Sequence, residues 1–553
     1  PMQSTLVGLA IGLHTTLRLT EEQRASFLET QQQFPGFSTA EFFKQKVDHF
    51  TAADTRVFDQ RYFESRSYWA GAHAPDPPVF LYLGGEAPLY GLPSGWVDEL
   101  AKEHGAILIA LEHRFYGKSQ PFDALTTENL SYLSTAQALL DVVSFRGFFS
   151  DEIRRAGGTG NGPWIAFGGS YAGALAAWLR AFFPSQFEGS ISSSGVVQLA
   201  LDFPKFDQQI AASCGPQCAQ VLQFTYQAIE AMLQEPPRNA WVKSKFAAEG
   251  LSDGDFRYLL SDAGSMAVQY GFAERLCQPM LQAAASAQGS IEPLLDAFSS
   301  YAQTNFYSTL ETGSSQEYDT NYLQQTVASE EKSARTWLYQ TCSELGWFQV
   351  APAENPVRFA NLTLDYFRGH CRDVFGRDLW PDIEAGNRNT GGAHLQATNV
   401  YFVNGGQDPW QHVSVTTSLP DGSISAGVMM CEGCSHCRDL KPSSWDDPQQ
   451  ARSARAAVAA AAVVAAAAVV AAAAVSQHLP VAPSHQRRCD PRVCPPLPRQ
   501  VRLVKAEAGQ RLASWLANFR IRQAQRVTTQ ELQQSGQGVL QAPGSALASD
   551  SGV

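Results

Sequence analysis

The sequence predicts an α/β protein built on a doubly wound, mostly parallel sheet, with a large helical segment inserted into it. Short apolar runs of the kind that form buried parallel strands recur along the chain. They lie at residues 79–83, 106–111, 164–167, 189–193, 400–403 and 426–430. Helical patterns separate most of them, the clearest at 133–145 and 171–183, and alternation of strands with helices favours a doubly wound sheet.

The gap between the fourth and fifth runs is far longer than an ordinary connection and predicts a helical domain. It is rich in Gln, Ala and Leu, with apolar residues at helical spacing, as in Val221, Leu222 and Ile229. Residues 505–520 predict a last helix that covers the sheet. We therefore expect a first part of the core at 46–197, a helical insertion (cap) at 198–395, a second part of the core at 396–440, a low-complexity Ala/Val and Pro-rich insertion at 441–500, a terminal core helix at 501–525 and a disordered tail at 526–553.

Composition favours the secretory route and argues against nucleic acid as a partner. The 553 residues include 41 basic and 53 acidic ones, and the formal charge of −12 repels polyanions. Ten cysteines are more than a cytosolic enzyme of this size usually needs, and glycosylation sequons start at Asn129 and Asn361. We expect residence in a lysosome or vacuole, in a vesicle or outside the cell. Residues 5–13 are apolar but follow no basic stretch, so a signal peptide is not demonstrable and truncation there stays open.

Residues 456–475 consist of alanine and valine alone and have the length of a membrane span. Alanine is only marginally apolar, however, and arginines and a Pro-rich stretch flank the run. A span here would also pull the last helix off the core. We therefore expect a low-complexity helix or a disordered insertion, and no membrane partner.

The most informative stretch is PWIAFGGSYAGA at residues 163–174, which predicts a strand, a glycine-rich corner that carries Ser170, and then a helix. Such a corner requires strained backbone angles and close contact between strand and helix, which small neighbours permit. Ala172 stands where the Gly-x-Ser-x-Gly pattern has its last glycine, which comes one residue later. A phosphate-binding loop would need a lysine and a spacing that are missing here. The stretch therefore predicts a nucleophilic serine.

A serine hydroxyl needs a base within hydrogen-bond reach and a carboxylate that orients the base. In this kind of fold the acid and then the histidine follow the serine along the chain. Asp408 lies just past the fifth expected strand and His436 just past the sixth, at the carboxyl ends where open α/β sheets bind ligands. We expect Ser170, Asp408 and His436 to form a triad. The alternative for Asp408 is a turn former ahead of a proline.

Backbone N–H groups must stabilise the oxyanion that forms during acyl transfer. We expect one donor from Tyr171, directly after the nucleophile, and a second from Glu86 or Gly85, in the loop after the first expected strand. His113 also follows a strand, but it precedes the serine, so we expect it to be structural or to support the site.

A cysteine cluster with zinc-like spacing surrounds His436, namely Cys431, Cys434 and Cys437. Thiolates bound to a metal there would occupy the histidine that the nucleophile needs, so we expect no metal, and no cofactor. Disulfides explain the cysteines better, and Cys342 with Cys371 is the preferred bridge.

Further motifs lie between residues 47 and 440: VDHF at 47–50, QRYF at 60–63, LGGE at 83–86, EHRFYG at 112–117, WLYQTCSE at 337–344, and the stretches 168–173, 403–410 and 433–440. In these segments the chain resembles the prolyl-carboxypeptidase-like serine peptidases, most closely their thymus-specific serine protease branch. The resemblance implies an α/β-hydrolase core with a helical insertion that caps the site, and a triad of Ser170, Asp408 and His436. It also implies short peptide substrates cleaved next to proline, with release of either a C-terminal residue or an N-terminal dipeptide.

Two residues are candidates for substrate binding. Glu86 could hold a terminal ammonium, with a buried structural role as the alternative. Trp410 could form an apolar wall for a proline ring, with a core role as the alternative. The function predicted is thus a serine exopeptidase that works through an acyl-enzyme. A carboxylesterase or lipase shares the same machinery, and an inert hydrolase-like binding protein, its site spoiled by the late insertion, is the other alternative. The oligomeric state stays open, with a homodimer as one option.

Overall fold

The computed structural model describes residues 39–441 and 499–537. An eight-stranded sheet runs through it in the order β1-β2-β4-β3-β5-β6-β9-β10, and the six strands from β4 to β10 along this order are parallel. The parallel strands are β3 (Val79–Leu83), β4 (Ile107–Leu111), β5 (Trp164–Gly169), β6 (Gly189–Ser193), β9 (Val400–Gly405) and β10 (Ile424–Met429). They arise from the six predicted apolar runs, and the ends of four of them are shifted by one or two residues. The chain has the predicted α/β-hydrolase fold.

Two strands at one edge of the sheet were not predicted. The strands β1 (Glu41–Lys46) and β2 (Val57–Ser65) pair antiparallel to each other, and β2 pairs antiparallel to β4. Their sequences, EFFKQK and VFDQRYFES, mix polar with apolar residues: much of β1 faces solvent, and the buried residues of β2 include Gln60 and Arg61. An edge strand of this kind lacks the continuous apolar run that marks a buried one.

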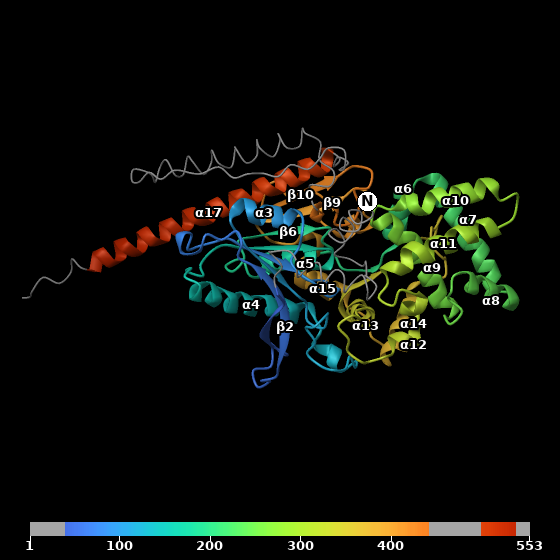
Figure 1. Cartoon of the computed structure of the whole chain (residues 1–553), viewed down its shortest axis with the longest axis horizontal. Coiled ribbons are helices and arrows are strands. Elements are labelled where there is room, and N and C mark those ends of the chain that lie inside the picture. The colour runs from blue at the N-terminus through green and yellow to red at the C-terminus, as the bar shows by residue number, and fades with distance from the viewer. Residues whose placement is uncertain (1–38, 442–498, 538–553) are drawn as a thin grey trace, which may run out of the picture.

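Alternate residues of each central strand face opposite layers of helices, as the two-residue period of a strand requires. In β3, Val79 and Leu81 pack with helices α4 (Thr135–Arg155) and α5 (Tyr171–Phe182), while Phe80 packs with α3 (Trp96–His104) and α17 (Arg499–Gln537). The helices therefore cover both faces of the sheet (Figure 1). The nucleophile corner lies between β5 and α5, at the carboxyl edge of this sandwich.

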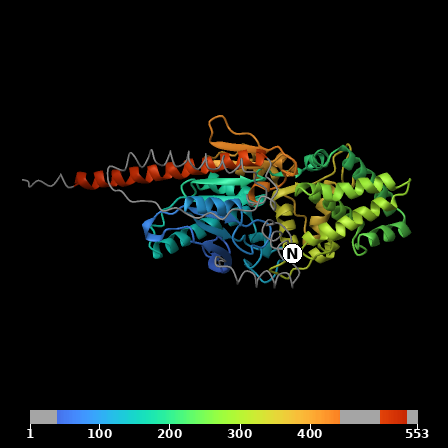
Figure 2. The same ribbon diagram turned by 45° about the horizontal axis from the view of Figure 1, so that its top comes forward.

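A second body of helices lies between β6 and β9 in the sequence and beside the sheet in space (Figures 1 and 2). Its helices are α6 (Pro204–Cys214), α7 (Pro216–Leu233), α8 (Pro236–Lys245), α9 (Asp253–Gln269), α10 (Ala273–Ser286), α11 (Glu292–Tyr301), α12 (Thr320–Leu323), α13 (Ala334–Gln340) and α14 (Leu364–Phe375). Helix α15 (Ile383–Thr390), from the same stretch of sequence, packs instead on the core of the sheet, near α5 (Figure 1). The same stretch of sequence also forms a small parallel pair of strands, β7 (Ala200–Asp202) and β8 (Gly346–Phe348). Disulfides join Cys218 to Cys277 and, as expected, Cys342 to Cys371.

The last helix, α17, packs on the sheet through Val504 and through apolar residues of the stretch that predicted it. A Cβ added to Gly427 of β10 would lie 3.0 Å from a methyl group of Val504, and Leu512 and Trp515 are buried in the same core. The helix continues to Gln537, so the expected start of a tail at residue 526 is wrong. Residues 521–535 contain good helix formers and no glycine or proline to end the helix. The predicted low-complexity insertion lies almost wholly outside the described residues, and among the helices that are described none combines the length and apolar character of a membrane span.

Candidate active site

Ser170 occupies the sharp corner between β5 and α5. Its backbone angles are φ 58° and ψ −126°, a conformation that costs a residue other than glycine about 1–3 kcal/mol. The Ser170 N–H donates to Ser193 O at 2.9 Å, which fixes the corner to the end of β6. A side chain at Gly168 would collide with the Ala172 carbonyl, and a Cβ at Gly173 would lie 2.8 Å from Ser193 O. Small residues are therefore required where strand and helix meet.

Asp408 and His436 form a buried pair in the loops that follow β9 and β10. His436 Nδ1 lies 2.9 Å from Oδ2 and 3.0 Å from Oδ1 of Asp408, and both side chains are almost completely buried. The Trp410 N–H donates to Asp408 Oδ1 at 2.9 Å and orients the carboxylate. Burial is the largest single effect on the pKa of His436 and lowers it, but the charges and hydrogen bonds of Asp408 and Cys437 together outweigh burial, so the pKa is raised well above its ordinary value.

The histidine loop lies against the serine corner. The Cys437 N–H donates to Ser194 Oγ at 2.9 Å, and a Cβ built on Gly169 would lie 3.0 Å from Cys437 Sγ. No hydrogen bond joins Ser170 Oγ to His436 within the described residues, and His436 Nε2, although buried, has no partner there. Nε2 is the nitrogen that a general base would use, and such contacts are often long in unliganded enzymes.

The two segments expected to supply oxyanion donors lie close together at the start of α5. Tyr171 is the first residue of α5, so its N–H has no acceptor within the helix. Gly85 packs against the same helix end, since a Cβ built on it would lie 3.6 Å from Ala172 N. Gly84 N–H is bound to Leu111 O at 2.8 Å, and Glu86 N–H bonds its own carboxylate. Of the two expected second donors, Gly85 is therefore the better placed.

A row of aromatic rings runs from the serine corner to His436. Ring centroids are 5.8 Å apart for Tyr171 and Trp337, and 6.2 Å apart for each of the next pairs along the row, Trp337 with Trp347, Trp347 with Trp410, and Trp410 with His436. Trp347 has φ 59°, a strained conformation for a bulky residue. Trp410 is 9% exposed, so it belongs to the core and also contacts the imidazole.

Two carboxylates lie near this row. Enclosure by protein raises the pKa of Glu86, and the charge of His436 acts in the opposite direction, which places the two groups within electrostatic reach. Burial also raises the pKa of Glu344, whose Oε2 accepts the Thr135 N–H at 2.9 Å. Sequence reasoning assigned no role to Trp337, Trp347 or Glu344. The only indication of a role in the sequence was that Trp337 and Glu344 are the first and last residues of the WLYQTCSE motif.

Comparison with known proteins assigns the family. The model of the serine carboxypeptidase S28 family matches residues 45–458. The chain belongs to this family. Relatives include the "Probable serine protease EDA2" of Arabidopsis thaliana (38% identical; 72% of this chain, 80% of that protein), human "Thymus-specific serine protease" (31%; 75% and 84%) and human "Lysosomal Pro-X carboxypeptidase" (26%; 75% and 86%). A Pyrobaculum calidifontis esterase of known structure is 18% identical over 35% of this chain and 56% of its own, with a TM-score of 0.22, too low to support an argument.

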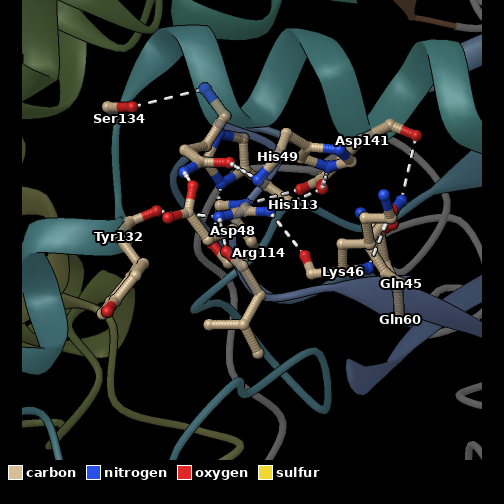
Figure 3. Close-up of polar contacts among 12 residues, drawn as sticks. Gln45, Lys46, Asp48, His49, Gln60, His113, Arg114, Tyr132, Ser134 and Asp141 are labelled. Atoms are coloured by element: carbon tan, nitrogen blue, oxygen red, sulfur yellow. Dashed lines mark hydrogen bonds and ion pairs between the residues drawn. The ribbon is translucent and has the colours of Figure 1, made fainter. Parts of the chain in front are cut away.

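As a member of the S28 family the chain is a serine-type peptidase, and His113 has the structural place expected of it. His113 is buried, with Nε2 3.2 Å from the Tyr171 hydroxyl and Nδ1 2.7 Å from Arg114 O. Burial lowers its pKa to about 4. Figure 3 shows the network that holds this loop, in which Arg114 makes two hydrogen bonds of 2.6 Å to Asp141, and His49 Nε2 lies 2.8 Å from the same carboxylate.

The cysteine cluster of this S28 peptidase contains a disulfide between Cys431 and Cys434, which closes the turn ahead of the histidine. Cys437 is a free thiol. Of the two sequon asparagines, Asn361 is exposed, whereas Asn129 is half-buried and its amide donates to Ala124 O at 2.8 Å.

Proposed function

We propose that this S28 peptidase is an exopeptidase that cleaves short peptides next to proline, through an acyl-enzyme on Ser170. The buried Asp408–His436 pair beside a strained serine corner is the observation that carries the proposal. Asp408 keeps the proton of the imidazole on Nδ1, which leaves Nε2 free to accept the proton of the Ser170 hydroxyl. The raised pKa of His436 increases the stability of the imidazolium that results.

In the reaction the Ser170 oxygen attacks the scissile carbonyl carbon. The N–H groups of Tyr171 and Gly85, with that of Glu86 as the alternative, would then stabilise the negative oxygen of the tetrahedral intermediate. His436 returns its proton to the leaving amine as the C–N bond breaks, and a water molecule deprotonated by the same imidazole hydrolyses the acyl-enzyme. Every step uses groups of this chain and water alone, without a metal or a cofactor.

The aromatic row supports a preference for proline. A proline ring is compact and apolar, and the row presents Trp337, Trp347 and Trp410 between the nucleophile's neighbour and the base. Glu86, partly exposed beside His436, would suit a terminal ammonium of the substrate. One relative is a Pro-X carboxypeptidase, and a carboxypeptidase releases a C-terminal residue instead. The test below therefore reads both ends of the peptide.

The helical insertion acts as a cap in this proposal and restricts the substrates to short peptides. Gln269, at the end of α9, accepts the His436 N–H at 2.9 Å, and the Tyr270 ring lies 6.1 Å from the imidazole. From α6, Ser213 Oγ donates to Gln407 O at 3.2 Å. The cap thus contacts the loops of both the base and the acid, where it would block long chains. We also place the protein on the secretory route, in a lysosome, vacuole or vesicle or outside the cell, in keeping with its disulfides.

A digest of a peptide library, read by mass spectrometry, tests the proposal. The wild type should shorten peptides at bonds that involve proline, from one end, and Ser170→Ala should not. Simple acyl esters provide the comparison. Turnover of esters without cleavage of any peptide would replace the peptidase by a carboxylesterase, and absence of both activities in a folded protein would make it an inert relative.

A further inference from the structure

Two serines at the tip of β6 contact all three segments that carry the proposed triad. Ser193 ends the strand and Ser194 follows it, and their exposed fractions are 0% and 1%. Neither belongs to the triad, and neither was singled out in the sequence. Their hydrogen bonds, however, reach the nucleophile corner, the strand that leads to the acid and the loop of the histidine.

The backbone of this tip fixes the nucleophile and the acid strand. Ser193 O accepts the Ser170 N–H at 2.9 Å, and Ser194 N–H donates to Val403 O at 2.6 Å. Val403 lies in β9, whose end carries the turn to Asp408. Any residue type could make these two backbone hydrogen bonds. They therefore explain how the tip is positioned, but not why its residues are serines.

The hydroxyls of the tip fix the histidine loop. Ser194 Oγ accepts the Cys437 N–H at 2.9 Å, directly after the imidazole. Ser193 Oγ donates to Asp439 Oδ1, and Asp439 is completely buried. The loop is therefore held at two points by side chains of one strand tip, and the same tip holds Ser170 through its backbone.

The backbone conformation of Ser194 indicates that a serine is present at this position for its hydroxyl group. Its φ is +45°, in the left-handed region that glycine adopts without strain and other residues adopt only with strain. A glycine would relieve the strain, yet the chain has a serine here and a glycine one position later. Ser190 of the same strand has an equally buried hydroxyl without any partner in the described residues, so burial alone does not produce these contacts.

We propose that Ser193 and Ser194 are positioning residues that keep His436 in register with Ser170. This inference rests on the proposed triad. Because a shift of about 1 Å at a reacting group can cost a factor of about 100 in rate, loss of the Ser194 hydroxyl should lower kcat about 10-fold to 100-fold and leave KM nearly unchanged.

The experiment compares Ser194→Ala, Ser194→Gly and Ser193→Ala with Ser190→Ala, in the full chain. The readouts are kcat and KM for a chromogenic acyl ester, the rate of labelling by a fluorophosphonate, and the melting temperature. We expect the three tip variants to lose kcat and labelling rate together, and Ser190→Ala to match the wild type. Ser194→Gly is decisive because it removes backbone strain as well as the hydroxyl, so it should melt at a higher temperature than Ser194→Ala and still be slow.

Equal labelling rates for Ser194→Gly and the wild type would overturn the inference while the proposed function stood. A change in KM with kcat intact would also overturn it, because the hydroxyl would then act on binding. If the wild type itself fails to react with the probe, the proposed function fails, and this inference fails with it.

Discussion

Replacement of Asp408 by asparagine should abolish most of the activity through the position of a single proton. Trp410 N–H donates to Oδ1 of Asp408 at 2.9 Å, so an asparagine would keep its carbonyl oxygen at that place. Its NH2 group would then take the place of Oδ2, which lies 2.9 Å from His436 Nδ1. A donor facing Nδ1 forces the imidazole to carry its proton on Nε2. A protonated Nε2 cannot accept the proton of the Ser170 hydroxyl.

The expected magnitude follows from loss of both the correct tautomer and the charge that stabilises the imidazolium. In triads of this kind the loss is about 10⁴-fold in kcat, which corresponds to about 5.4 kcal/mol of transition-state stabilisation. Steady-state hydrolysis of an acyl ester measures it, with the melting temperature as a check on folding. Asp421→Asn is the matched control. Asp421 lies in the exposed turn between β9 and β10, so this variant should be as active as the wild type. An Asp408→Asn enzyme that keeps more than about a tenth of the wild-type kcat would refute the reasoning.

Two further predictions concern stability. Gly173→Ala places a Cβ 2.8 Å from Ser193 O, so it should lower the free energy of unfolding by about 1–3 kcal/mol and reduce ester turnover. In the control variant Gly147→Ala the new Cβ meets nothing within 4 Å, so this change should stabilise α4 by about 1 kcal/mol. Equal urea midpoints for the two variants would count against the tight corner. Burial raises the pKa of Asp262 from 3.8 to about 6, so its stabilising contribution is complete below pH 3.8 and is lost as the pH rises through 6. The wild type should therefore lose about 2 kcal/mol relative to Asp262→Asn between pH 4 and pH 7, and parallel curves of unfolding free energy against pH would contradict the shift.

The strands of the core could be predicted because each is a local apolar run. Residues 79–83 and 189–193 have the same bounds in the sequence prediction and in the structure, since both strands are buried on both faces. The edge strand β1 could not be found in this way, because its residues are mostly polar and exposed. The length of α17 was underestimated because its second half lacks the apolar spacing by which a helix is recognised.

The candidate triad could be placed from motif order and strand ends, which are also local signals. The residues around it could not, because their roles depend on contacts between distant segments. Trp347 joins the aromatic row from a segment more than 170 residues beyond Ser170 in sequence. Its positive φ could not be predicted from the sequence. Ser194 likewise gains a role only because the loop 243 residues later returns to it.

The identity of the residue that forms the covalent adduct tests the central claim most directly. The full chain would be treated with a fluorophosphonate, digested, and mapped by mass spectrometry, alongside Ser170→Ala and His436→Ala. We predict a single adduct on Ser170, none in Ser170→Ala, and strongly slowed labelling in His436→Ala. An adduct on another residue, or a folded wild type that stays unlabelled, would contradict the account.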